Sequence, residues 1–159
     1  MPRLPRARGF TFIELMTTLA ILGVLVLVAA PLGQVVAQRR KEHELRVALI
    51  EIRQGIDDYK RATEQGRILL KIGDSGYPPN LEALVQGVPD VRSPTRQTIF
   101  FLRRVPADPF SADQTRPTAS WGLRAYASSP DDPHPGADVY DVYTQSTATG
   151  LNGVPYRQW

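Results

Sequence analysis

The pattern of hydrophobic and polar positions divides the chain into an apolar N-terminal run and a mixed remainder. No charged side chain occurs from Leu15 to Gln38, and the apolar character begins earlier, at Phe10. A helix over this run is roughly 36 Å long at about 1.5 Å per residue, against a bilayer core of about 30 Å. The run therefore predicts a transmembrane helix over residues 10–33.

Two other interpretations of the apolar run stay open. A cleaved secretory signal has basic, apolar and small-residue regions in the same order, with Val28 and Ala30 before the cut. Pro31 would then follow the cut directly, which fits poorly. The third interpretation is a buried helix of a soluble core.

A second helical pattern follows the apolar run. Its apolar residues are spaced four and three positions apart, which places them on one face of a helix. They are Leu45, Leu49, Ile52, Ile56 and Tyr59, and the opposite face carries Glu44, Arg46, Glu51, Arg53, Asp58 and Lys60. We expect one helix from about Phe10 to Glu64 with a stop near Gly66, interrupted at Pro31 and Gly33. Its amphipathic half, residues 34–64, is too short for a coiled coil and is expected to pack on a sheet.

Shorter elements are predicted over residues 65–159, the head of the molecule. Asn80 is expected to cap a helix from Leu81 to Gln86, which Gly87 ends. β-branched and aromatic residues in alternation predict strands over Trp121–Ser128 and Val139–Thr144. The remaining assignments are a loop over Val88–Gln97, a strand or helix end over Thr98–Leu102, and a proline-rich loop over Pro130–Gly136.

The residues around Gly9 carry a recognisable motif. Arg8-Gly9-Phe10-Thr11-Phe12-Ile13-Glu14-Leu15 resembles the cleavage and methylation site of type IV prepilins and type II secretion pseudopilins. The resemblance implies that a prepilin peptidase cuts after Gly9 and methylates Phe10, so that residues 1–9 are a leader peptide. It also implies assembly roles for Glu14 and for Pro31, which stands where the family has a proline.

Glu14 lies inside the membrane-seeking segment. A charged side chain at the centre of a membrane helix costs roughly 2.5–3.5 kcal/mol, and less near its end. The resemblance suggests what offsets this cost: the amine that cleavage leaves on Phe10 of a neighbouring subunit pairs with Glu14. Such a pair would set the register of subunits in a filament. The simpler alternative is that Glu14 snorkels to the lipid headgroups.

The head resembles the major, G-type pseudopilin of type II secretion. The resemblance rests on four short segments in the same order: Tyr77-Pro78, Leu81–Val85, Val105–Phe110 and Asp138–Tyr143. It implies an α+β, pilin-like fold, in which a long N-terminal helix packs on a small antiparallel sheet. A chain insertion before Trp121 departs from that pattern.

The resemblance also implies a calcium-binding loop after the last strand, and here the chain departs again. The corresponding residues, Thr144–Gly153, include no carboxylate, whereas calcium takes several oxygen ligands, normally charged ones among them. We therefore expect no cofactor. A calcium site formed instead by aspartates of the preceding loop and strand stays an alternative: Asp131, Asp132, Asp138 and Asp141.

Composition narrows the function. The 159 residues include no cysteine and carry a net charge of +3, and Arg39-Arg40-Lys41 is a short solvated stop without interleaved aromatics. Nucleic-acid binding is therefore not expected. The two histidines, His43 and His134, belong to no metal or nucleophile motif and are expected to face solvent, so we expect no enzyme.

Together the residues and the resemblance predict an assembly subunit. The expected location is the bacterial inner membrane, with one transmembrane pass and a periplasmic head; basic residues flank the anchor on both sides, so this orientation rests on the resemblance. The expected partners are copies of the same chain in a helical filament, minor pseudopilins, the inner-membrane assembly platform and prepilin peptidase. The alternatives are a type IV pilin of a surface fibre and a membrane-tethered periplasmic binding module that does not polymerise.

Overall fold

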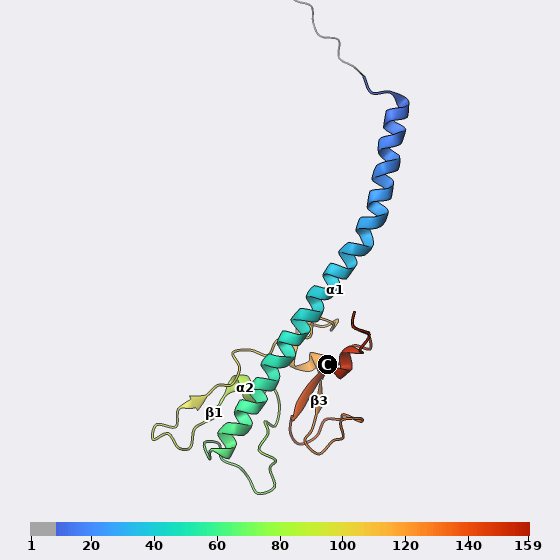
Figure 1. Cartoon of the computed structure of the whole chain (residues 1–159). Helices are drawn as coiled ribbons and strands as arrows, with labels where there is room; N and C mark the ends of the chain where they lie inside the picture. The colour runs from blue at the N-terminus through green and yellow to red at the C-terminus, as the bar shows by residue number, and fades with distance from the viewer. Residues whose placement is uncertain (1–8) are drawn as a thin grey trace, which may run out of the picture. The chain divides into compact units, whose positions relative to one another are not determined.

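The computed structural model describes residues 9–159, so the predicted leader lies outside the described residues except for Gly9. The chain divides into two compact units, Met1–Arg39 and Arg40–Trp159. The elements, shown in Figure 1, are α1 (Phe12–Glu64), α2 (Glu82–Gln86), β1 (Val88–Pro89), β2 (Thr98–Ile99), the 3-10 helix η1 (Pro117–Ser120), β3 (Trp121–Arg124), β4 (Asp141–Thr144) and the 3-10 helix η2 (Tyr156–Gln158). The predicted α+β class is confirmed.

Helix α1 ends where the sequence predicted. Gly66 has a positive φ of 68°, a conformation that glycine adopts without strain. The N–H of Arg67 donates to the carbonyl of Ala62 at 3.0 Å, and the N–H of Gly66 donates to that of Thr63 at 2.9 Å. These two bonds form a Schellman motif, which satisfies carbonyls that the helix end leaves free.

Helix α1 continues through Pro31 and Gly33, so the predicted interruption does not break the helix, and the kink expected at Pro31 stays a prediction. A proline removes one N–H donor from the ladder and disfavours the helix at one turn.

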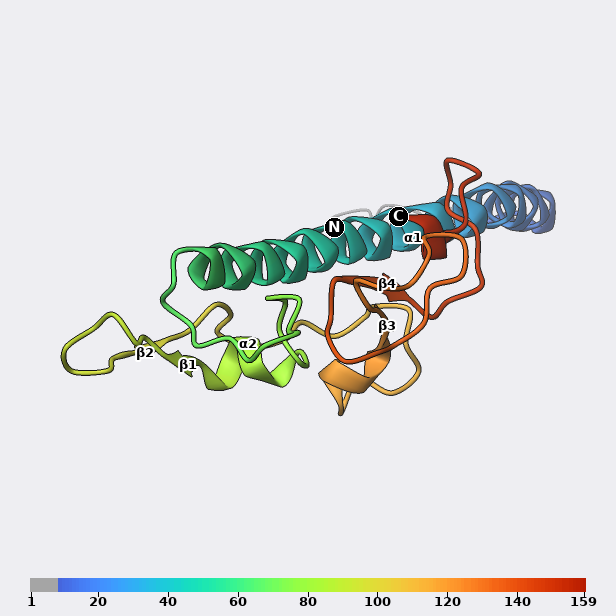
Figure 2. The same cartoon turned by 90° about the horizontal axis from the view of Figure 1, so that it is seen from below.

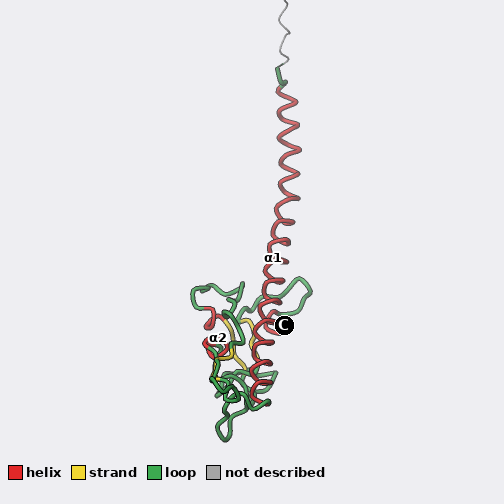
Figure 3. Tube along the Cα trace, turned by 90° about the vertical axis from the view of Figure 1, so that its left-hand side faces the viewer, coloured by secondary structure: helices red, strands yellow, loops and turns green. Residues whose placement is uncertain are grey.

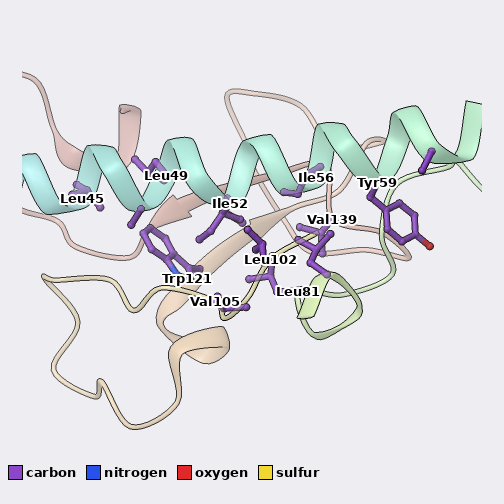
Figure 4. Close-up of a cluster of buried hydrophobic side chains, with 14 of the residues drawn as sticks. Leu45, Leu49, Ile52, Ile56, Tyr59, Leu81, Leu102, Val105, Trp121 and Val139 are labelled. Atoms are coloured by element: carbon purple, nitrogen blue, oxygen red, sulfur yellow. The ribbon is translucent and has the colours of Figure 1, made fainter. Parts of the chain in front are cut away.

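The C-terminal half of α1 forms one side of the head core. All five residues of the predicted apolar stripe are buried: Leu45, Leu49, Ile52, Ile56 and Tyr59. They pack against residues from the head, including Leu81, Leu102, Val105, Trp121 and Val139 (Figure 4). Figure 2 shows α2 and the sheet of β3 and β4 along this half of the helix. The helix is thus as much part of the head as the segments that follow it.

The predicted short helix is confirmed within one residue. The Oδ1 atom of Asn80 accepts a hydrogen bond from the N–H of Ala83 at 2.9 Å, at the start of α2. Gly87 follows the helix with φ 78°, and its N–H donates to the carbonyl of Ala83 at 3.1 Å. An amide side chain before the first turn and a glycine after the last therefore set both ends.

The head contains two separate two-stranded antiparallel sheets and not one larger sheet. Their short strands are drawn in yellow in Figure 3. In the first, Val88 pairs with Ile99, so the expected loop over Val88–Gln97 begins with a strand instead. In the second, Trp121 pairs with Thr144 and Arg124 pairs with Asp141.

Both strands of the second sheet are shorter than predicted. β3 ends at Arg124 and not at Ser128, and β4 begins at Asp141 and not at Val139. Beyond Arg124 the backbone bonds elsewhere: the N–H of Ala125 donates to the carbonyl of His134 at 3.1 Å, and that of Tyr126 donates to Asp138 Oδ1 at 2.8 Å. The proline-rich loop therefore takes the donors that a longer ladder would have used.

Two residues assigned to the solvent face of α1 are instead half-buried. The Arg53 Nε atom donates to Asp141 Oδ1 at 2.8 Å, and Lys60 Nζ donates to the carbonyl of Ser75 at 2.9 Å. Long basic side chains can cover apolar surface with their stems while their charged ends reach polar partners. The head therefore covers the flanks of α1 as well as its apolar stripe.

We expect Ile52→Ala to lower the free energy of unfolding of the head by about 2–5 kcal/mol, since it leaves a cavity in a close-packed core. Ile52 is fully buried, whereas Ile50, one position from the stripe, is 55 % exposed. Ile50→Ala is therefore the matched control, expected to change stability little. Urea unfolding followed by tryptophan fluorescence measures both, and equal effects of the two variants would contradict the assigned core.

Candidate functional site

The start of α1 places Glu14 in the first helical turn. The N–H of Glu14 donates to Thr11 Oγ1 at 3.3 Å, and the N–H of Thr11 donates to Glu14 Oε2 at 3.4 Å. This reciprocal arrangement is a capping box, which satisfies two backbone donors at a helix start. Gly9 and Phe10 precede the helix and are exposed. The structure thus gives Glu14 a local role within its own chain.

The N-terminal half of α1 exposes apolar side chains on every face. Exposed residues follow one another without a polar side, among them Ile21, Leu22, Val24, Leu25, Val26 and Leu27. By length and composition α1 could cross a membrane. None of the most apolar stretch of this helix is buried against the rest of the chain. Such a helix needs an apolar environment, either lipid or neighbouring apolar helices.

Two threonines in the apolar run bond to the backbone of their own helix. Thr17 Oγ1 donates to the carbonyl of Ile13 at 2.8 Å, and Thr18 Oγ1 donates to that of Leu15 at 2.9 Å. A hydroxyl bonded in this way carries no unsatisfied donor into an apolar environment. Pro31, the other predicted assembly residue, lies within α1.

Within residues 9–159, no group of three or more His, Cys, Asp or Glu side chains is arranged to hold a metal ion. His43 and His134 are exposed, as expected. Two of the four aspartates of the alternative calcium cluster have protein partners: Asp138 accepts hydrogen bonds from the Ser75 hydroxyl and the Tyr126 N–H, and Asp141 binds Arg53.

A cavity of about 650 Å³ opens between the loop after α1 and the loop after β3. Its lining includes Tyr59, Tyr77, Tyr126 and Asp74. Burial raises the pKa of Tyr59, and the neighbouring Asp74 raises it further. Burial also raises the pKa of Tyr77, followed by the neighbouring phenols of Tyr140 and Tyr126. The raised pKa values of Tyr59 and Tyr77 keep both phenols protonated at neutral pH, so that each can donate a hydrogen bond.

The fold and the exposed apolar helix together define a membrane-associated chain with a small α+β head. The family model of the prokaryotic N-terminal methylation motif matches residues 4–30. This chain therefore has a prepilin-type N-terminus, which supports a subunit of the type IV pilin-like kind, processed by prepilin peptidase. Neither the comparison with curated proteins nor that with solved structures gives a match.

Proposed function

We propose that the chain is a structural subunit of a type II secretion pseudopilus. The observation that carries the proposal is the methylation motif at residues 4–30, continued by an apolar helix that exposes every face. A helix of this kind is stable in a bilayer before assembly and in a bundle of like helices afterwards. The proposed role is mechanical, without catalysis.

The proposed mechanism begins in the bacterial inner membrane, with one pass and the head in the periplasm. Prepilin peptidase removes residues 1–9 and methylates Phe10. An inner-membrane platform then extracts the subunit, and its helix joins those of other copies in the filament core, beside minor pseudopilins. The heads form the surface of a short filament that pushes folded proteins outward.

The head supports the secretion role over a surface pilus. The four segments that resemble the G-type pseudopilin come together around one core, to which Leu81, Val105 and Val139 contribute. Two of them join directly, since the N–H of Val139 donates to the carbonyl of Pro78 at 2.8 Å. The chain also has no cysteine, whereas many type IV pilins close a C-terminal disulfide loop.

The neighbouring genes and crosslinking between copies of the chain separate the secretion role from its two alternatives. A neighbouring gene for an outer-membrane secretin, with a secretion ATPase and further pseudopilins, favours the secretion role over a surface fibre.

Because the chain has no cysteine, pairs of introduced cysteines in the apolar run report only on the chosen positions. Crosslinking between copies in the membrane excludes the non-polymerising binding module.

Processing is the most direct test of the proposed function. In cells with an active prepilin peptidase, we expect the mature chain to begin with N-methylated Phe10 and to lack residues 1–9. Gly9→Val should leave the precursor uncut, because a branched side chain then occupies the position before the scissile bond. Intact-mass spectrometry of membrane extracts measures both products.

Gly23→Val is the matched control for this test. It makes the same substitution in the apolar run, where added bulk meets no neighbouring atom within 4 Å. It should therefore be processed like the wild type. A mature chain that retains Met1, or one cut after Ala30, would contradict the assignment and favour an unprocessed anchor or a secretory signal.

A further inference from the structure

The last residues of the chain, Thr144–Trp159, form a segment with little regular structure of its own. It contains the short helix η2 and one isolated bridge between Thr149 and Pro155. A segment of this kind depends on contacts outside itself for a fixed conformation. In the pseudopilins that the head resembles, bound calcium fixes the conformation of the corresponding segment. The carboxylates nearest the segment therefore decide whether calcium can bind here.

Glu42, on α1, is the first of these carboxylates. It is only 7 % exposed, and its Oε1 atom accepts hydrogen bonds from the N–H of Leu151 and the hydroxyl of Tyr156, both at 2.8 Å. Tyr156 is itself buried, and its ring stacks on Phe110 with centroids 4.2 Å apart. Through these two bonds Glu42 holds the segment to the helix at two points.

Arg53 holds the other end of the segment to α1. Its Nη2 atom donates to the main-chain oxygen of Trp159 at 2.9 Å and to the carbonyl of Val142 at 3.2 Å. Its Nε atom donates to Asp141, the second carboxylate nearby. The guanidinium of Arg46, two helical turns before Arg53 on the same face of α1, lies 4.4 Å from the centre of the Trp159 ring. One arginine thus joins strand β4 and the end of the segment to the same helix.

Asp108 is the third carboxylate beside the segment, and it too has protein donors. It is buried, accepts a hydrogen bond from the hydroxyl of Thr144, and accepts another from the N–H of Phe110 at 2.8 Å. Calcium requires six to eight oxygen ligands in one place. Here the three carboxylates lie at separate points, each with its own donors, so the residues present do not fit a calcium ion.

We infer that Glu42 and Arg53 fix the segment Thr144–Trp159 to α1 directly, so that the head folds without a divalent cation. Residues far apart in the chain take the structural role that a bound metal would otherwise fill. If the proposed function holds, assembly of the filament should be equally insensitive to calcium. The folding statement itself does not depend on the filament.

The first experiment measures thermal unfolding of the full chain in detergent micelles, followed by tryptophan fluorescence. We expect the same midpoint, within about 1 °C, in excess calcium and in excess EGTA. A native-state site saturated at a hundred times its dissociation constant would instead raise the midpoint on the order of 10 °C. Such a rise would overturn the inference. Because this measurement needs no filament, it can fail while the proposed function stands.

The second experiment compares two glutamates of the same helix. Glu42→Ala should lower the midpoint by several degrees and should expose Tyr156, which is buried in the intact head, to chymotrypsin before the rest of the head. Glu42→Gln should restore part of the loss, because an amide oxygen still accepts one hydrogen bond. Glu44→Ala is the matched control. Glu44 is exposed on the same helix and forms a surface ion pair with Arg40 at 3.7 Å.

The outcomes of the second experiment are distinct. Equal behaviour of the Glu42 and Glu44 variants would overturn the role of Glu42. If Glu42→Ala does not fold, Arg53→Met provides the same comparison at the other end of the segment, with exposure of Tyr156 to chymotrypsin as its readout. Protection of the segment by calcium in either variant would also overturn the inference.

Discussion

A chain truncated to begin at Gln34 is expected to be a soluble, folded monomer that forms no filaments. All the buried apolar residues of the described core lie at or beyond Leu45, so the truncation removes none of them. It does remove the exposed apolar residues from Phe10 to Leu32, which make the full chain dependent on lipid or on other helices. Light scattering after size-exclusion chromatography measures the mass, and electron microscopy detects filaments.

The processed full-length chain is the control for this truncation. Diluted out of detergent, it should assemble, whereas the truncated chain at the same concentration should stay monomeric. Ordered filaments from the truncated chain would show that the heads alone drive assembly. A truncated chain that aggregates without a cooperative unfolding transition would show that the head needs the apolar half of α1 to fold.

The helical parts of the fold could be predicted because their signals are local. The spacing of Leu45, Leu49, Ile52, Ile56 and Tyr59 specifies a buried helix face without reference to what covers it. Gly66 marks the helix end because positive φ costs glycine little. The same locality applies to Asn80 and Gly87 at the ends of α2.

The first sheet and the C-terminal contacts depend on residues distant in sequence, and no local pattern predicts them. Val88 pairs with Ile99 across a loop that contains Pro94. Residue propensities assign Val88–Gln97 to a loop, because they carry no information about this pairing. Glu42 bonds to Tyr156 across more than a hundred residues. On a helical wheel Glu42 is simply one more charged residue, so only the packed structure shows that it is buried.

The N-terminal site was predicted in part, from a family resemblance and not from local helix signals. The resemblance pointed to Gly9, Phe10, Glu14 and Pro31 as residues of cleavage, methylation and assembly, and those roles stay predictions. The capping box was present in the sequence as Thr11-Phe12-Ile13-Glu14, the Ser/Thr-x-x-Glu signature of a helix start.

Glu14→Gln is expected to give a mature, membrane-inserted subunit that fails to join filaments. The substitution keeps the shape of the side chain, and glutamine also serves in a capping box, so the bond from the Thr11 N–H can persist. Only the charge is lost. Insertion becomes easier, because a neutral amide costs less in the bilayer than a carboxylate. Assembly nevertheless falls, since the Phe10 amine of the neighbouring subunit loses its partner, at a cost of about 3–5 kcal/mol for a buried pair.

Thr11→Val is the matched variant, because it removes the cap and keeps the charge. It deletes the hydroxyl that accepts the Glu14 N–H, a loss of about 1 kcal/mol at the helix start, and should reduce assembly only slightly. Sheared-filament yield and secretion of a reporter protein measure both variants, and cleavage after Gly9 should persist in each. If instead Glu14→Gln assembled like the wild type and Thr11→Val failed to assemble, Glu14 would act as a helix cap and would not set the register of subunits.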